Sequence, residues 1–201
     1  MHIEPATEAT ARGAADVLTE AFVDDPVYGY LLEGADRRRR LDRFFLGVVR
    51  TALGPGGVVD LALDEDRTVL GAAVWSRHPA PPAARLRNLR EGWRMPLALR
   101  PRGVVHLRTY LRRTAPYRTP GPHWSLDDIG VSAAGRGRGV GGALIRHRLA
   151  LIDEQRAIVD LDSTTRGSRR LYARYGFRVA GPAGTEAAPE ATIMVRTPPE
   201  G

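Results

Sequence analysis

The chain has 201 residues, no cysteine and no lysine, so all 30 of its basic residues are arginine. These absences exclude disulfides, thiolate metal ligands, a cysteine nucleophile and a P-loop lysine, and we predict no metal site. A net charge of +7 is compatible with nucleic-acid binding, but the arginines are scattered and no aromatic residues alternate with them to stack bases. Neither a membrane-spanning apolar run nor a signal-peptide pattern is present. We therefore expect one cytoplasmic domain over residues 1–201, with no nucleic-acid or membrane partner.

The first half of the chain predicts a strand, two helices and a hairpin. The expected elements are a strand at residues 3–6, a helix that starts after Thr7 or Thr10 and ends before Pro26, a helix at 37–53, and hairpin strands at 58–63 and 68–76. Tyr28 and Tyr30 follow the break at Pro26, so we expect them in a loop or short turn. The consecutive arginines 37–40 are expected to be solvated in the first turn of their helix.

The second half alternates strands and helices after an insertion. Residues 79–122 are rich in proline and are expected to form two helices, near 86–94 and 104–113, packed on the sheet. The elements expected after it are a central strand at 123–131, a helix at 139–155, a strand at 158–161, a helix at 166–175 with Thr164 or Thr165 as cap, and strands at 177–180 and 192–195. This order predicts a mixed α/β (α+β) fold, with a central mixed sheet of about six or seven strands flanked by helices.

A glycine-rich loop follows the central strand and opens the next helix. Such a loop lets backbone N–H groups converge on a phosphate, and the helix N-terminus adds partial positive charge. Gly137–Gly142 fits the G-x-G-x-x-G pattern of dinucleotide-binding folds, with Asp160 or Asp162 about twenty residues further on. That fold places its first glycine directly after the strand and needs several further parallel strands. Here Ser132–Arg136 intervene and only about 60 residues remain, which excludes a dinucleotide-binding fold.

Two motifs resemble the GNAT superfamily of acyl-CoA-dependent N-acetyltransferases. Arg136-Gly-Arg-Gly-Val-Gly141 is similar to its Arg/Gln-x-x-Gly-x-Gly/Ala signature, and Tyr172-Ala-Arg-Tyr-Gly-Phe177 to its Tyr-x-x-x-Gly-Phe segment. Smaller similarities at residues 21–26, 122–124 and 193–196 resemble the puromycin N-acetyltransferase branch of the superfamily. The resemblance implies a GNAT-like fold and acetyl-CoA as donor. It also implies direct transfer of the acetyl group to a primary amine of a small molecule, such as an antibiotic or a biosynthetic intermediate.

The resemblance also implies which residues bind the donor. The N–H groups of the loop would hold the pyrophosphate, and the central strand would pair with the pantetheine arm and supply an oxyanion donor. Many relatives carry an asparagine a few residues before the tyrosine. This chain has Thr164–Ser168 there, and Thr165 or Ser168 would replace that hydrogen bond. The implied cofactor-binding residues are Ile129, Gly130, Val131, Arg136, Gly137, Arg138, Gly139, Val140, Gly141, Gly142, Thr165 and Ser168.

The resemblance places Tyr172 as the general acid of the reaction. A tyrosine, with a pKa of about 10, is a suitable acid for a departing thiolate whose thiol has a pKa of about 8.5. Asp127 is the first candidate for the base that deprotonates the amine, and Asp162 is the second. Three alternatives are open: His123 acting through water, a chain of water molecules, or a role for either carboxylate in binding a cationic substrate.

The resemblance also implies that residues between the first two helices shape the acceptor site. Strand alternation puts Asp127 on one face with Ser125 and Ile129. The residues expected to bind the acceptor are Asp25, Tyr28, Tyr30, Trp75 and Ser125, with Asp24, Trp93, Tyr110 and Tyr117 as further candidates. Two other functions stay open, namely acetylation of peptide or protein N-termini and a non-catalytic acyl-CoA-binding module. The expected oligomeric state is a monomer or a homodimer.

Overall fold

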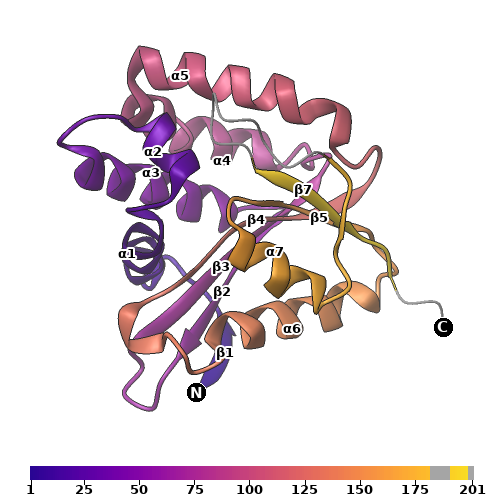
Figure 1. Ribbon diagram of the computed structural model, residues 1–201. Coiled ribbons are helices and arrows are strands. Elements are labelled where there is room, and N and C mark those ends of the chain that lie inside the picture. The colour runs from indigo at the N-terminus through magenta and orange to yellow at the C-terminus, as the bar shows by residue number, and fades with distance from the viewer. Residues whose placement is uncertain (182–190, 199–201) are drawn as a thin grey trace.

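The computed structural model describes residues 1–181 and 191–198. Its helices are α1 (Ala11–Phe22), α2 (Pro26–Leu31), α3 (Arg37–Ala52), α4 (Ala84–Glu91), α5 (Arg94–Thr114), α6 (Val140–Asp153) and α7 (Arg166–Ala173), with short 3₁₀ turns η1 (Ala115–Tyr117) and η2 (Ala133–Gly135). Its strands are β1 (His2–Pro5), β2 (Gly57–Leu63), β3 (Val69–His78), β4 (His123–Val131), β5 (Val159–Ser163), β6 (Arg178–Val179) and β7 (Thr192–Arg196) (Figure 1). The predicted order of strands and helices is confirmed, except that α2 is an additional helix.

The strands form one seven-stranded sheet in the order β1-β2-β3-β4-β5-β7-β6. All neighbours are antiparallel except β4 and β5. These two parallel strands pair only from Trp124 to Leu126, whereas β4 stays paired with β3 as far as Val131. The second half of β4 therefore has a free edge, and a gap opens between β4 and β5. The predicted mixed sheet of about six or seven strands is confirmed.

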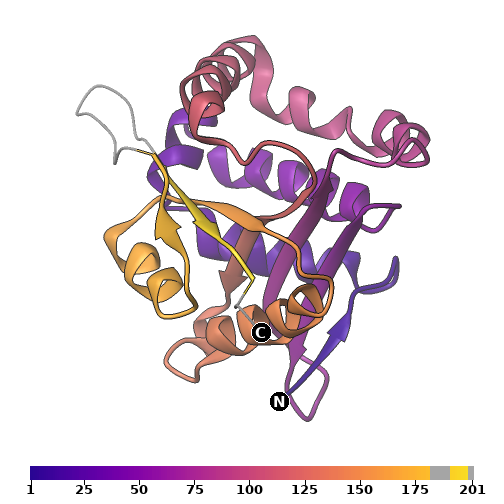
Figure 2. The ribbon, with the colours of Figure 1, turned by 90° about the vertical axis from the view of Figure 1, so that its right-hand side faces the viewer.

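Each face of the sheet carries its own apolar core, because alternate side chains of a strand point to opposite faces. Helices α1, α2 and α3 cover one face, and α6 and α7 cover the other (Figures 1 and 2). The first core includes Leu18, Leu41, Phe45, Leu61 and Val74. The second includes Trp75, Leu126, Leu144, Leu161 and Phe177. Each such side chain contributes about 1.5–3 kcal/mol when it is fully buried.

Residues 26–31 form a helix rather than the expected loop. Asp25 caps it, because its carboxylate accepts hydrogen bonds from the N–H groups of Val27 (2.9 Å) and Tyr28 (3.1 Å). Pro26 occupies the first turn, where its missing N–H costs nothing. The Asp-Pro pair that ends α1 therefore also begins α2, and it fixes the direction in which Tyr28 points.

The insertion between β3 and β4 packs mainly on α2 and α3, not on the sheet as predicted. Its long helix α5 is interrupted at Arg100, where φ is 60° and ψ is 169°, directly before Pro101. The carbonyls of Ala98 and Leu99 therefore come at a helix end and accept hydrogen bonds of 2.7 and 2.9 Å from Arg40. Arg40 is buried, so the prediction of a fully solvated arginine turn is wrong for this residue.

Candidate active site

A bulge in β4 lies at the centre of the site. Val74 of β3 pairs with Asp128, and the following Trp75 pairs with Leu126, so Asp127 is an extra residue in β4. A bulge of this kind interrupts the alternation of side chains along a strand. Two adjacent carboxylates, those of Asp127 and Asp128, consequently point to the same face of the sheet, which is the face covered by α2.

Hydrogen bonds fix the two carboxylates on that face. Ser76 donates a 3.0 Å hydrogen bond to Asp127, and Tyr28 donates one of 2.6 Å to Asp128. Ile129, beyond the bulge, packs instead into the core beneath α6. The prediction that Asp127 and Ile129 share a face is therefore wrong, because simple alternation does not allow for the extra residue.

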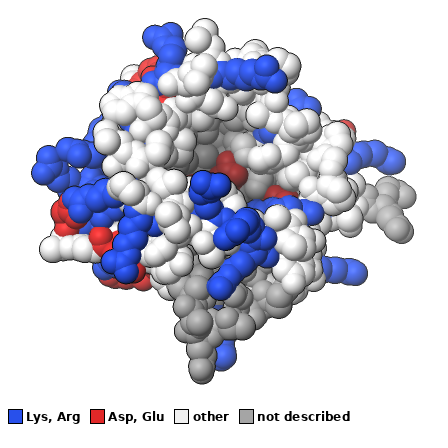
Figure 3. Space-filling model, turned by 90° about the horizontal axis from the view of Figure 1, so that it is seen from above, with Lys and Arg blue, Asp and Glu red and all other residues white. Residues whose placement is uncertain are grey.

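A cavity of about 440 Å³ opens over these carboxylates, beside the gap between β4 and β5. Figure 3 shows a hollow with acidic surface at its floor and arginines around its rim. The polar residues that line the cavity are Asp24, Asp25, Tyr28, Tyr110, Asp127, Asp128, Asp162, Thr164, Thr165, Ser168 and Tyr172. Carboxylates and tyrosines of five separate parts of the chain, namely the start of α2, α5, β4, β5 and α7, therefore face one cavity.

Asp127 is the carboxylate of the pair that remains accessible. Its side chain is exposed, but to the cavity rather than to the outer surface, whereas Asp128 is only 7% exposed. Burial within the cavity raises the pKa of Asp127 to about 7, against the opposing effect of hydrogen bonds from Ser76 and Ser125. A carboxylate with this pKa accepts and releases a proton near neutral pH, as a general base must.

Asp128 and Asp25 are occupied by structural partners. Burial raises the pKa of Asp128, and the hydrogen bond from Tyr28 only partly offsets this. Burial and the neighbouring Asp128 also raise the pKa of Tyr28, so the phenol keeps its proton. The second oxygen of Asp25 accepts a 2.6 Å hydrogen bond from Thr164, which joins α2 to the end of β5.

Tyr172 reaches the cavity from the other layer of the protein. It belongs to the core between the sheet and α6, where its ring packs edge-on against Phe177 at 5.9 Å, and it also lines the cavity. The open gap between β4 and β5 makes this double position possible. Burial raises the pKa of Tyr172, with a smaller effect from Asp128, so its hydroxyl is protonated at neutral pH.

The glycine-rich loop forms an open cradle at the start of α6. Gly137 and Gly139 both have a φ of +74°, which favours glycine, and a Cβ at either position would meet nothing within 4 Å. Val140, Gly141 and Gly142 form the first turn of α6, whose N–H groups have no acceptor within the helix. Open space, free N–H groups and the helix dipole together fit a phosphate.

The residues on either side of the cradle differ in role. Arg136 and Arg138 are exposed beside it and add two positive charges. Gly130, predicted to bind the cofactor, is instead required by packing, because a Cβ there would lie 2.8 Å from the Cβ of Ala21 on α1. Only its backbone, on the free edge of β4, remains available to a ligand.

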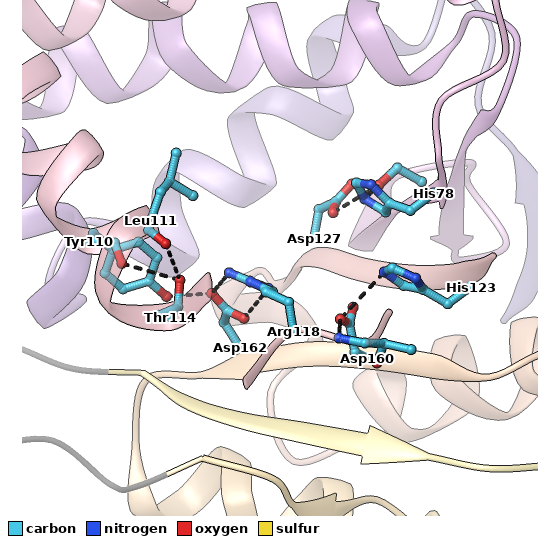
Figure 4. A network of polar contacts seen from close by, with 11 residues as sticks. His78, Tyr110, Leu111, Thr114, Arg118, His123, Asp127, Asp160 and Asp162 are labelled. Carbon is cyan, nitrogen blue, oxygen red and sulfur yellow. Dashed lines mark hydrogen bonds and ion pairs between the residues drawn. The ribbon is translucent and has the colours of Figure 1, made fainter. Parts of the chain in front are cut away.

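Asp162, the second candidate base, is held in an ion pair. Arg118 donates hydrogen bonds of 2.6 and 2.7 Å to its two oxygens, and Tyr110 donates another to it. Figure 4 shows Arg118 and Tyr110 converging on this carboxylate from the insertion. Asp162 lines the cavity but is already neutralised, and it fastens the insertion to β5.

His123 lies at the start of β4, away from Tyr172. Its Nδ1 is 2.8 Å from the Gly121 carbonyl, and its Nε2 is 3.5 Å from Asp160 (Figure 4). Its ring stacks on that of His78 with the centroids 4.9 Å apart. His123 does not line the cavity that contains Tyr172.

Two predicted acceptor residues lie elsewhere. Trp75 is fully buried in the core beneath α6, on the opposite face of the sheet from the cavity. Tyr30 stacks on His106 at 4.1 Å and lines a separate pocket with Arg40. Both predictions are wrong, because each assumed that an aromatic residue near the site in sequence would face it.

Three hydroxyl residues have partners of their own. Thr165 and Ser168 form a capping box that starts α7, with a 3.1 Å bond from the Ser168 N–H to the Thr165 hydroxyl. Both still line the cavity. Ser125 is buried beneath it and hydrogen-bonds to Asp127, so it supports the carboxylate rather than lining the cavity.

Sequence reasoning missed three contributors to this region, namely Asp128, Ser76 and Arg118, whereas Tyr110, named as a further acceptor candidate, does line the cavity. One signal was available for Asp128. Two consecutive aspartates within an otherwise apolar strand break the alternating pattern, and a bulge is the usual way to accommodate such a pair. The other two come from segments far away in the sequence, and only the register of the sheet and the position of the insertion bring them to the site.

The described residues contain no cluster of three or more side chains suited to holding a metal ion. Within the same ranges, every helix is too short or too polar to span a membrane.

Comparison with known proteins finds a matching family and several similar structures. Residues 58–177 match the Acetyltransferase (GNAT) family. The crystal structure described as histone acetyltransferase HPA2 and related acetyltransferase from Corynebacterium glutamicum is similar, with a TM-score of 0.74, 25% identity, and coverage of 99% of this chain and 97% of that chain. A GCN5-related N-acetyltransferase from Kribbella flavida has a TM-score of 0.58 and 21% identity, with coverage of 98% of this chain and 96% of that chain. A polyamine N-acetyltransferase from Drosophila melanogaster, described as forming N-acetylagmatine, has a TM-score of 0.57 and 16% identity. The match covers 98% of this chain and 99% of that chain.

No curated protein sequence matches the chain. The family match nevertheless covers more than half of the residues, and it includes β2 to β5, the glycine cradle and Tyr172. The chain belongs to the Acetyltransferase (GNAT) family, whose enzymes use acetyl-CoA as the acetyl donor.

Proposed function

We propose that the protein transfers the acetyl group of acetyl-CoA directly to a primary amine of a small molecule. One observation carries the proposal. Asp127, a carboxylate with a pKa of about 7, and Tyr172, a protonated phenol, line the same cavity beside the gap between β4 and β5. A base and an acid that face one enclosed space are what an acyl transfer to an ammonium group requires.

The donor is proposed to bind across the cradle and the gap. The N–H groups at the start of α6 hold the pyrophosphate, with Arg136 and Arg138 close enough to add charge. Acetyl-CoA supplies a thioester to this site. The free edge of β4, from Ile129 to Val131, is available to the pantetheine arm and offers an N–H to the oxyanion that forms during attack.

The proposed chemistry divides two proton transfers between two residues. Asp127 accepts a proton from the acceptor ammonium, and the free amine attacks the thioester carbon. As the carbon–sulfur bond breaks, Tyr172 gives its phenolic proton to the departing sulfur. The attacking nitrogen loses its second proton as the amide forms, and this proton passes through water to the Tyr172 phenolate. The chain has no cysteine, so no cysteinyl acyl-enzyme intervenes.

The lining of the cavity supports a cationic acceptor with an apolar part. Asp24, Asp25, Asp127 and Asp128 all face it. Phe22, Leu31 and Phe44 supply the apolar part of its wall. Agmatine and polyamine N-acetyltransferases are among the similar structures. Amines such as agmatine and polyamines are cationic, which suits the acidic part of the cavity. A puromycin-like amine, with an aromatic group beside its amine, suits both parts.

We also propose that the protein is a monomer or a homodimer located in the cytoplasm. Asp162 is assigned a supporting role. Its ion pair with Arg118 keeps it from acting as a base and holds the insertion over the acceptor.

The proposal is tested by following the release of free CoA thiol with a panel of amines. The panel contains agmatine, spermidine, arylalkylamines, puromycin, aminoglycosides and short peptides with free N-termini. We expect saturable turnover with at least one small amine and mass-spectrometric detection of its N-acetyl product. Turnover of peptides alone would replace the proposal with N-terminal acetylation. Tight binding of acetyl-CoA without any turnover would identify an acyl-CoA-binding module.

A further inference from the structure

We infer that Ser76 and His78 form a proton exit that carries the proton from Asp127 to solvent, on the side of the sheet facing α4. This inference rests on the proposed function, in which Asp127 takes a proton from the acceptor. Neither residue belongs to the motifs that identify the family in the sequence. Both lie near the end of β3, on the strand next to the bulge.

The three side chains form a continuous hydrogen-bonded chain. The Ser76 hydroxyl donates to the Asp127 Oδ1 at 3.0 Å, and the same Ser76 oxygen lies 3.2 Å from the His78 Nε2. Figure 4 shows His78 and Asp127 side by side above β4. The bulge makes this chain possible, because it keeps Asp127 on the face from which Ser76 and His78 project.

The chain leads from the substrate cavity to a second cavity. Asp127 lines both, whereas Ser76 and His78 line only the second, which has a volume of about 320 Å³. His78 itself is exposed, so water reaches its ring. A proton that moves along this chain therefore leaves by a route that does not cross the cavity containing Tyr172.

One proton passes from Asp127 through Ser76 to His78. Once Asp127 has taken the amine proton, its carboxyl O–H donates to the Ser76 oxygen, and the Ser76 hydroxyl turns to donate to the neutral Nε2 of His78. A concerted shift moves one proton from Asp127 to Ser76 and another from Ser76 to His78. Asp127 is again ionised, Ser76 is unchanged and His78 is an imidazolium. His78 then releases its Nδ1 proton to water, which leaves the ring protonated at Nε2. Exchange of the ring protons with water, with Nδ1 regaining a proton and Nε2 losing one, restores the starting tautomer.

The surroundings of His78 favour that release. Burial lowers the pKa of His78, with a further lowering by the stacked His123 and by Arg118, and a partial offset by Asp160. These groups come from β4, from the segment after η1 and from β5. Arg77 of β3 and Asn88 of α4 also face the second cavity. A ring with a lowered pKa does not hold the proton at neutral pH, so the exit is open for the next cycle.

The test compares His78→Gln and Ser76→Ala with the wild-type enzyme, using His147→Gln on α6 as the matched control. We expect both exit variants to lower kcat about tenfold at low buffer concentration, a modest share of what general acid–base catalysis supplies. The KM of the acceptor and the Kd of acetyl-CoA should stay within about twofold of wild type. Ser76→Thr, which keeps the hydroxyl, should restore kcat, and added imidazole should rescue His78→Gln but not Ser76→Ala. His147→Gln should match wild type.

An unchanged kcat in His78→Gln, together with loss of turnover in Asp127→Asn, would overturn the exit and leave the proposed function intact. A second measurement does not depend on turnover. The Nε2 resonance of His78, followed by nitrogen NMR across pH, should shift in both Ser76→Ala and Asp127→Asn. If the Nε2 resonance were the same in both variants as in the wild type, the inference would be overturned, even if no acceptor were found.

Discussion

The Tyr28 hydroxyl donates a 2.6 Å hydrogen bond to Asp128, the neighbour of the carboxylate that we propose as the base. This bond separates the tasks of two adjacent aspartates. Asp128 is buried and hydrogen-bonded to Tyr28, and it ties β4 to α2, whereas Asp127 is exposed to the cavity. The bulge alone would present two equivalent carboxylates to the cavity. The hydrogen bond from Tyr28 engages Asp128, so Asp127 is the one available to accept a proton.

Tyr28→Phe should therefore destabilise the fold by about 1–3 kcal/mol, because it leaves a buried carboxyl group without its partner. The ring contacts with Phe22, Phe44 and Phe45, at centroid distances of 5.0, 5.5 and 5.1 Å, are kept by phenylalanine. Urea denaturation measures the loss. Tyr30→Phe removes a hydroxyl outside the cavity and serves as control. Equal midpoints for the two variants would show that the bond to Asp128 contributes nothing.

Tyr172→Phe should lower kcat at least tenfold, since a positioned acid contributes about 10²–10⁴-fold. The ring still packs on Phe177, so stability and acetyl-CoA affinity should change little. Steady-state kinetics and titration calorimetry measure the two effects separately. Tyr175→Phe is the matched control, because the Tyr175 hydroxyl contacts Arg146 at 3.2 Å, outside the cavity. Full turnover in Tyr172→Phe would remove this residue as the acid.

Gly139→Asp should weaken acetyl-CoA binding about a hundredfold or more, equivalent to about 2.8 kcal/mol. A carboxylate there would project into the open cradle and repel the pyrophosphate. Gly121 offers an unusually close control, because it also has a φ of +74° and open space around its missing Cβ. Gly121→Asp imposes the same backbone strain outside the cradle. If both variants bound acetyl-CoA equally well by calorimetry, the cradle would not hold the pyrophosphate.

The kcat of the wild-type enzyme should rise with pH and level off above about 7, where Asp127 is ionised. The same shift acts on stability in the opposite direction. Because burial raises the pKa of Asp127 from 3.8 to about 7, its protonated form favours the folded state, and this contribution is lost as the pH rises through that range. In Asp127→Asn, the rise of kcat with pH should disappear. The free energy of unfolding should also fall less between about pH 4 and 7 than it does in the wild type. An unchanged kcat profile in Asp127→Asn would contradict its role as base.

The features that were predictable from sequence are those set by local chemistry. The conformational freedom of Gly137 and Gly139, the cap at Thr165 and the periodicity of α6 each depend on a few neighbouring residues. The position of Tyr172 followed from a motif of six residues. These signals need no knowledge of how distant segments meet, so the sequence order of elements and the cradle could be predicted.

The parts that were not predictable depend on register and on packing between distant segments. A single extra residue at Asp127 changes which face Ile129 occupies, and no local pattern fixes its position in the pairing with β3. Trp75 is adjacent to Ser76 in the chain, but the two point to opposite faces. Arg118 meets Asp162 only because the insertion folds back over β5. Whether a side chain faced the cavity was therefore decided by the sheet and the insertion together.

Arg40 provides a test of how the insertion is held. Its buried guanidinium donates to the carbonyls of Ala98 and Leu99 and, at 2.8 Å, to that of Glu33. Arg40→Met keeps the aliphatic stem but leaves these carbonyls unpaired, and we expect a loss of about 3 kcal/mol in unfolding free energy. Arg39→Met, an exposed position in the same helical turn, should have no effect beyond about 0.5 kcal/mol.

Hydrogen exchange shows where the Arg40 effect acts. Faster exchange should be confined to α5 and the end of α2, while the sheet keeps its protection, because Arg40 joins α3 to the insertion and not to β4. A loss of protection spread evenly over the sheet would mean that Arg40 supports the whole fold. Since the insertion carries Tyr110 and Arg118 to Asp162, its loosening should also raise the KM of the acceptor while leaving acetyl-CoA affinity at its wild-type value.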